Sequence, residues 1–270
     1  EDADGGGGVD TVGINRLFYQ FPIGENFTAT FGAKVRQDDM LAMWPSVYPG
    51  DSILDLFTYG GAGGTYSLNL GAGVGIWYQK DGFSLSANFV SNEVASENSA
   101  FGVDDGYTFT VQAGYAGSNW GVALAYTYLD FSSPFVDAFA YANNGGLSAY
   151  WQPSEASWVP SISAGFGVGT ASLDDSDNYS WMVGLQWADV AIKGNMLGMA
   201  LGTSSNIGGS RGIVFSDQPG DGTLAYELWY KFQVTDNISV TPAFFWVENS
   251  AIAGIEGSGD DTYGALIKTT

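Results

Sequence analysis

The sequence predicts an all-β protein, an antiparallel up-and-down transmembrane β-barrel. Segments of about ten residues alternate between large apolar and small or polar side chains, which is the periodicity of a strand with one apolar face. Aromatic residues stand at both ends of several apolar faces, and short connections between segments alternate with long ones. Both features are typical of barrels that span an outer membrane.

The alternation is clearest at residues 107–116. Tyr107, Phe109 and Val111 fall on one face of this segment, and Thr108 and Thr110 fall on the other. The pattern recurs along the chain, and no helical periodicity persists for three turns. We therefore expect thirteen strands in one domain over residues 1–270. They are expected at 12–21, 26–36, 65–79, 83–91, 107–116, 119–129, 143–152, 157–168, 178–188, 195–202, 223–234, 236–247 and 262–270.

A soluble β-sandwich would show the same alternation, so the position of the aromatic residues matters. Trp and Tyr stand at the ends of the apolar faces, as they do at the two interfaces of a membrane barrel. A sandwich would place its bulk in mid-strand, facing its own core. A secreted acidic, glycan-binding sandwich remains the alternative. The flanking pairs are Tyr107 and Tyr115, Trp120 and Tyr128, and Tyr179 and Trp187.

The lengths of the connections predict which strand ends face the cell. Outer-membrane barrels have short periplasmic turns and long outer loops, an even strand number and both termini in the periplasm. Here the segment before the first strand would lie outside, so we expect an odd number of strands to be missing before Glu1. No signal peptide is visible at the start. The short connections are 22–25, 80–82, 117–119, 154–157, 189–194 and 235–236, and the long ones are 37–64, 92–106, 130–142, 169–177, 203–222 and 248–261.

Composition excludes several classes of function. The net charge is −21 with only 8 Lys and Arg, which argues against a nucleic-acid partner. The chain has no Cys and no His, so thiolate metal sites, His-ligated zinc and His-based catalysis are excluded. Gly71, Gly73 and Gly75 lack the strand–loop–helix context of a phosphate loop and are expected to line the interior or allow close packing. We expect no enzyme activity, no catalytic residue, no metal and no cofactor.

Strand parity predicts which charged residues face the interior. In the first hairpin and around residues 224–232, the apolar faces, which include Phe31 and Val35, are expected to contact lipid. A charge on the lipid face costs about 2–4 kcal/mol at mid-membrane, so charges turn inward whether or not they attract anions. Both explanations remain open. The predicted pore-lining charges are the basic residues Arg16, Lys34, Arg36 and Lys231 and the acidic residue Glu227.

The longest connection, 37–64, carries several acidic residues and an apolar stretch at 40–44. If it folds into the barrel, it narrows the interior; if it is an exposed outer loop, it does not. The sequence leaves both possibilities open. Folded inward, its carboxylates would oppose basic wall residues across a constriction and create a transverse field. These acidic residues are Asp38, Asp39, Asp51 and Asp55.

Four stretches resemble the cyanobacterial outer-membrane porins, which pair an S-layer-homology domain with a carbohydrate-selective (OprB-type) porin barrel. They are FYQFPIGENFTATFGAK (18–34), GAGVGIWYQKDGFSLSANFVS (71–91), YELWYKFQVTDNISVTPAFFWVEN (226–249) and YGALIKTT (263–270). The last two are the most specific, and the resemblance covers essentially the whole chain. It implies sixteen strands, of which three would be missing, and a C-terminus that stops short of the family's final aromatic residue.

The resemblance also implies a function. We expect passive diffusion of small hydrophilic solutes and ions across a bacterial outer membrane, with sugars, inorganic ions or iron as candidates. The expected partners are outer-membrane lipid, further copies of the chain in a homotrimer, and the cell wall through a missing N-terminal domain. A structural anchoring barrel with little conductance is the alternative. If sugars pass, aromatic rings that parity turns inward would stack on them, namely Phe18, Trp77, Trp229 and Phe245.

Overall fold

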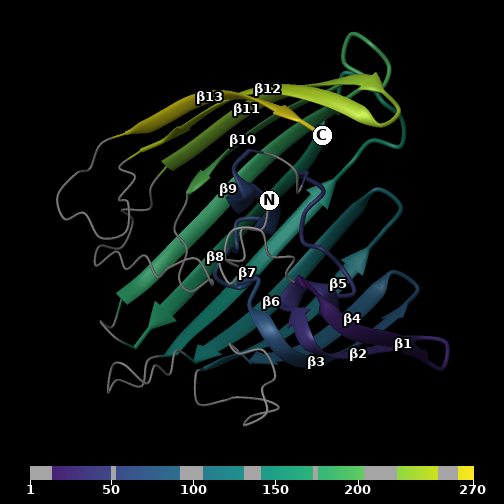
Figure 1. Ribbon diagram of the computed structural model, residues 1–270, viewed down its shortest axis with the longest axis vertical. Coiled ribbons are helices and arrows are strands. Elements are labelled where there is room, and N and C mark those ends of the chain that lie inside the picture. The colour runs from purple at the N-terminus through teal and green to yellow at the C-terminus, as the bar shows by residue number, and fades with distance from the viewer. Residues whose placement is uncertain are drawn as a thin grey trace.

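The structure, a computed structural model, describes residues 14–49, 53–91, 106–130, 141–172, 176–203, 224–248 and 261–270. All thirteen predicted strands are present, and each pairs with the next along the chain in one antiparallel sheet (Figure 1). The predicted all-β, up-and-down fold class is confirmed. The strands are β1 (Leu17–Ile23), β2 (Phe27–Arg36), β3 (Leu70–Lys80), β4 (Phe83–Ser91), β5 (Tyr107–Ala116), β6 (Trp120–Asp130), β7 (Tyr141–Trp151), β8 (Ser161–Ala171), β9 (Ser176–Ala188), β10 (Met196–Thr203), β11 (Leu224–Thr235), β12 (Ile238–Val247) and β13 (Thr262–Thr269).

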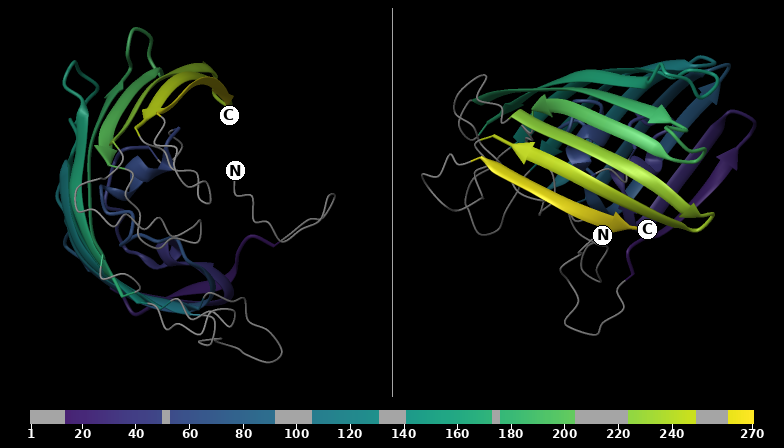
Figure 2. Two further views of the ribbon diagram at one scale, coloured as in Figure 1. Left: turned by 90° about the vertical axis from the view of Figure 1, so that its left-hand side faces the viewer. Right: turned by 90° about the horizontal axis from the view of Figure 1, so that it is seen from above.

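The sheet curls into an open barrel wall with β1 and β13 at its two margins (Figure 2). Within the described residues, β1 pairs only with β2, and β13 pairs only with β12. A β-sandwich consists of two sheets packed face to face, so the alternative of a soluble sandwich does not fit this single curved sheet. No helix among the described residues is long and apolar enough to cross a membrane.

The two faces of the wall differ as the alternation predicts. On β6, Leu124 is 61% exposed on the outer face, whereas Ala123 and Ala125 are buried on the inner face. The register keeps apolar residues together across neighbouring strands, since Leu124 pairs with Ala113 on β5 and with Leu147 on β7. The wall therefore has an apolar outer belt and an inner lining of small and polar side chains, which suits hydrocarbon outside and a polar interior.

A shift of register in β2 interrupts this alternation between Gly32 and Val35. Val35 was expected to face lipid, but it is fully buried and packs with Met40 and Val90. That expectation is wrong because a bulge adds a residue to one strand and moves the following side chains to the opposite face. Beyond the shift, strand parity no longer argues that Arg36 points inward.

The chain between β2 and β3 lies on the concave side of the sheet, where it appears in dark blue (Figure 2). It contains two short 3-10 helices, η1 (Gln37–Met40) and η2 (Asp55–Tyr59). We call residues 37–69 the inner loop. The buried apolar clusters lie between this loop and the wall; one of them joins Tyr48 and Phe57 to Met182. Strand β3 therefore begins at Leu70 rather than at 65 as expected, because residues 65–69 belong to the inner loop.

Candidate functional site

The described part of the inner loop is bound along the inner face of the wall. Its hydrogen bonds reach the six consecutive strands from β4 to β9, so this segment folds inward and is not an exposed outer loop. These bonds join Ala42 N to Ser86 Oγ (2.9 Å), Gln37 Nε2 to Thr110 Oγ1 (2.7 Å), Thr127 Oγ1 to Thr65 O (2.5 Å), Ser148 Oγ to Gly60 O (3.2 Å), Val47 N to Ser163 Oγ (3.0 Å) and Ser180 Oγ to Gly61 O (2.7 Å).

Glycines of the wall let the inner loop approach closely. A Cβ added at Gly75 on β3 would lie 2.8 Å from the Cβ of Met40, and one added at Gly146 on β7 would overlap Ala62. Such distances are shorter than side chains tolerate, so only glycine leaves room for the loop at these positions. The sequence suggested an interior lining or close packing for Gly75, and the structure gives it close packing against the loop.

Glu227 on β11 holds the loop farthest along the sheet. Its Oε1 accepts a hydrogen bond from the Tyr48 hydroxyl at 2.6 Å, and its Oε2 accepts from the backbone N–H groups of Leu54 at 2.6 Å and Ile53 at 3.1 Å. The side chain is completely buried. Sequence parity placed Glu227 on the lining of the pore. It does face the inner side of the wall, but the inner loop covers it.

Tyr48 connects this carboxylate to Trp229. The Trp229 indole donates a hydrogen bond to the Tyr48 hydroxyl at 2.9 Å, and the Tyr48 hydroxyl donates in turn to Glu227. Burial raises the pKa of Tyr48 far above its usual range, and the nearby Glu227 carboxylate raises it further. Tyr48 therefore stays protonated and keeps its donor role. Trp229 is only 4% exposed, so this ring, predicted to stack on sugars, is covered by the loop.

Two of the predicted basic residues meet predicted loop carboxylates at the root of the inner loop. Arg16 Nε lies 2.8 Å from Asp39 Oδ2, and Arg36 Nε lies 2.5 Å from Asp38 Oδ1. Asp39 also accepts a hydrogen bond from the backbone N–H of Arg36 at 2.9 Å. Two members of each set expected to face each other across a constriction are in direct contact here, where the loop leaves β2.

The remaining predicted charges are distributed differently. Lys34 donates a hydrogen bond from Nζ to the backbone oxygen of Ile14 at 2.9 Å. Lys231 is half-buried on β11. Asp51 lies outside the described residues, and Asp55 begins η2 with a side chain that is not among those described. The structure thus gathers Arg16, Arg36, Asp38 and Asp39 at one place, whereas Glu227 and Lys231 lie on β11, nine places from β2 in the order of the sheet.

Three other aromatic residues were predicted to stack on sugars. Phe18 on β1 is 38% exposed. Trp77 on β3 is half-buried beside the cluster of Val35, Met40 and Val90. Phe245 on β12 is half-buried. Phe18, Trp77 and Phe245 therefore keep some exposed surface, unlike Trp229.

Sequence reasoning missed the residues that fasten the loop. Tyr66 is buried, and its hydroxyl accepts a hydrogen bond from Gln112 Nε2 on β5 at 2.9 Å. Burial raises the pKa of Tyr66 to about 12, and the hydrogen bond from Gln112 lowers it in part. Trp44 packs against Tyr66 with ring centroids 5.6 Å apart. The apolar stretch at 40–44, which includes Trp44, was the available signal.

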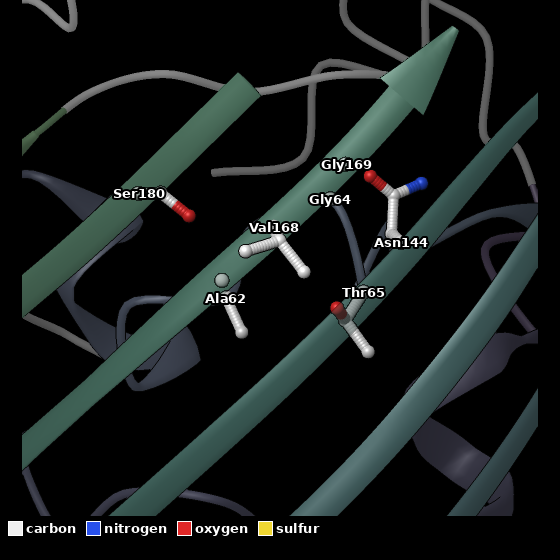
Figure 3. A pocket seen from close by; sticks show the side chains of 8 residues that line it. Ala62, Gly64, Thr65, Asn144, Val168, Gly169 and Ser180 are labelled. Atoms are coloured by element: carbon white, nitrogen blue, oxygen red, sulfur yellow. The ribbon is translucent and has the colours of Figure 1, made fainter. Parts of the chain in front are cut away.

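A small polar cavity lies between the inner loop and strands β7 to β9 (Figure 3). The side chains of Thr65, Asn144 and Ser180 surround it together with Val168. Its volume is about 10 Å³, roughly that of one water molecule. This space is too small to be a path for a sugar.

Comparison with known protein families gave no match to a family model. An uncharacterised protein of the cyanobacterium Nostoc sp. is 31% identical over 151 residues, which are 55% of this chain and 24% of that protein. An uncharacterised protein of the cyanobacterium Synechocystis sp. is 25% identical over 288 aligned residues, covering 89% of this chain and 51% of that protein. The chain thus spans about half or less of the length of these curated relatives.

Two solved structures share the fold. OprB of Pseudomonas putida superimposes with a TM-score of 0.57 at 13% identity, over 93% of this chain and 70% of that one. OmpT of Vibrio cholerae, an outer membrane protein, gives a TM-score of 0.51 at 12% identity, over 82% of this chain and 66% of that one. The up-and-down wall of thirteen strands is therefore a fold that outer-membrane β-barrels also have.

Proposed function

We propose that this chain forms most of the wall of an outer-membrane porin, through which small hydrophilic solutes and ions diffuse passively. The observation that carries the proposal is the inner loop, because it lies on the polar concave side of a wall whose outer face is apolar. A membrane barrel needs an apolar exterior, and a selective aqueous channel needs something that narrows its interior. Diffusion through such a channel requires no catalytic group and no cofactor.

The proposal includes closure of the barrel by further strands. The exposed backbone groups at the margins of β1 and β13 would be unsatisfied in hydrocarbon, so a membrane barrel must pair them. The resemblance to cyanobacterial outer-membrane porins suggests sixteen strands, a single barrel domain, a homotrimer and an additional domain that attaches to the cell wall. Matches to longer cyanobacterial proteins are consistent with additional sequence.

The proposal extends to the class of solute that passes through the channel. The resemblance points to sugars, and Phe18, Trp77 and Phe245 are the aromatic residues that could stack on them, since Trp229 is covered. Inorganic ions, including iron, are equally compatible with a lining of small and polar side chains. The ion pairs at the root of the loop, Arg16 with Asp39 and Arg36 with Asp38, would give this part of the lining little net charge.

Single-channel recording tests the proposal directly. The full-length protein, refolded in detergent and added to a planar lipid bilayer, should produce stepwise increases in current. A sample of the same protein denatured by heat before addition serves as the control. If folded protein inserts but carries no current, the barrel is a structural anchor blocked by its inner loop, and the porin function is wrong. Reversal potentials in salt gradients and block by added sugars then identify the class of solute.

A further inference from the structure

We propose that Glu227 is a positioning residue whose carboxylate latches the inner loop to the wall and thereby sets the width of the channel. This inference rests on the proposed function and extends it. The sequence placed Glu227 among the charges that line the pore. The structure assigns it a mechanical role instead, because the carboxylate is completely buried beneath the loop and is occupied by hydrogen bonds from the loop.

The position of the latch along the loop decides its effect. The inner loop leaves the wall at β2 and rejoins it at β3, and Glu227 contacts the middle of the loop at Tyr48, Ile53 and Leu54. Strand β11 is eight places away from β3 in the order of the sheet. A loop tethered by both ends to one side of a barrel can swing about that side, whereas a bond from its middle to a distant strand holds it across the interior.

The latch is chemically stronger than the contacts of the loop with strands β4 to β9. From β4 to β9 the side-chain partners on the wall are neutral groups, namely hydroxyls such as those of Ser86 and Ser163 and amides such as that of Gln112. At β11 a carboxylate accepts from three donors of the loop, and hydrogen bonds to a charged acceptor are about twice as strong as those between neutral groups. Loss of this acceptor would leave two backbone N–H groups and a hydroxyl without their partner.

Packing around the latch keeps it away from water. Tyr48 lies edge to face with Phe57 and Trp229, at centroid distances of 6.4 and 6.3 Å. Met182 and Ala200 from the neighbouring strands complete this buried cluster. A dry environment strengthens each hydrogen bond and raises the cost of breaking it. Glu227 and the ring of Tyr48 therefore act as one unit.

The test measures whether the inner loop is held against the wall, and it does so independently of conductance. Residues 1–270 contain no cysteine, so Thr58→Cys gives a single label in the full-length protein once any cysteine outside this range is replaced by serine. Thr58 lies in η2 and is only 4% exposed, so a maleimide should react slowly while the loop is seated. Adding Glu227→Ala should increase the labelling rate of the folded protein in detergent at least about tenfold, and Glu227→Gln and Tyr48→Phe should give smaller increases.

A matched control removes an equal charge elsewhere. Glu155 lies in the exposed turn between β7 and β8, so Glu155→Gln should leave the labelling rate unchanged. Retention of the folded, heat-modifiable band in gel electrophoresis shows that each variant still forms a barrel. If Glu227→Ala does not fold, Tyr48→Phe provides the decisive measurement, because it removes one donor and keeps the acid.

The outcomes separate the latch from the porin function. Faster labelling together with a larger and noisier channel current supports both. Faster labelling of a protein that never conducts, even without substitutions at the latch, supports the latch and contradicts the porin function. Labelling that stays slow in folded Glu227→Ala, or in Tyr48→Phe when the former does not fold, overturns the latch whether or not the protein conducts.

Discussion

At the scale of single residues, the arginines at the root of the inner loop act as members of ion pairs. Arg16 contacts Asp39, and Arg36 contacts Asp38. The four side chains are partly exposed, with exposures of 16–25%, so each pair contributes modestly to stability and its effect weakens with salt. In the proposed channel their larger effect would be on passing ions, since the removal of one partner uncovers the charge of the other.

Charge substitutions at one of these pairs should change ion selectivity in opposite directions. Arg36→Gln leaves the Asp38 carboxylate uncompensated and should shift the zero-current potential of the full-length porin toward cations. Asp38→Asn leaves the guanidinium uncompensated and should shift it toward anions. The double variant Arg36→Gln/Asp38→Asn should return close to the value of the natural protein. Equal potentials in all four proteins, measured in a salt gradient across a planar bilayer, would place this pair away from the path of ions.

The same residues show where reasoning from the sequence stops. Period-two alternation identified the strands, but it assumed that no residue is inserted in β2. The register shift between Gly32 and Val35 turns Val35 inward and removes the argument for the orientation of Arg36. A bulge has no clear signature in a segment such as FGAKVR, because small and apolar residues fit both faces. The burial of Glu227 could not be predicted because it depends on a contact 173 residues away in the chain, with Leu54.

At the scale of elements, the inner loop and the wall pack closely because glycines stand at their points of contact. Gly165 on β8 lies against the backbone of Gly60, and Gly61 lies against the backbone of Gly165. Two backbones can approach this closely only if neither carries a side chain at the contact. Sequence alternation predicts small residues on the inner face. It cannot distinguish a glycine that faces a water-filled interior from a glycine that contacts the inner loop.

Gly165→Ala should therefore displace the inner loop. The added Cβ would overlap the carbonyl oxygen of Gly60, a backbone atom that cannot rotate away. Overpacking of this kind costs about 1–3 kcal/mol, and we expect a lower unfolding temperature in detergent and faster labelling at Thr58→Cys. Gly145→Ala on β7 is the matched control, because its Cβ would meet only Val168 at an ordinary 3.6 Å. Identical behaviour of the two variants would contradict the close seating of the loop.

A second prediction at the scale of elements concerns the outer face of the wall. Leu124 stands in the middle of β6 and is 61% exposed where lipid is expected. Leu124→Arg should reduce the free energy of folding into a bilayer by about 2–4 kcal/mol, because a cation at mid-membrane loses its hydration. The same substitution at Trp158, which is 87% exposed in the turn after β7, should have little effect. Urea titration of the protein folded in lipid vesicles measures both.

At the scale of the whole molecule, the order of the strands was the most predictable property. Each strand pairs with its neighbour in sequence, so local alternation and the turns between segments suffice to predict the topology. The position of the inner loop was not predictable in the same way, because it depends on hydrogen bonds to strands β4 to β9 and to β11 at once. Local patterns predict the wall, and long-range contacts determine what lies inside it.

The open margins of the wall lead to the last prediction. Strands β1 and β13 each have one neighbouring strand among the described residues, so one edge of each has no partner strand there. Such edges are unsatisfied in hydrocarbon and adhere to other strands in water. Residues 1–270 expressed alone should therefore fail to give a heat-resistant, monomeric band in detergent, whereas the full-length protein refolded in the same way should give one. A heat-resistant monomer from residues 1–270 alone would mean that β1 and β13 pair with each other, and the proposal of additional strands would have to be abandoned.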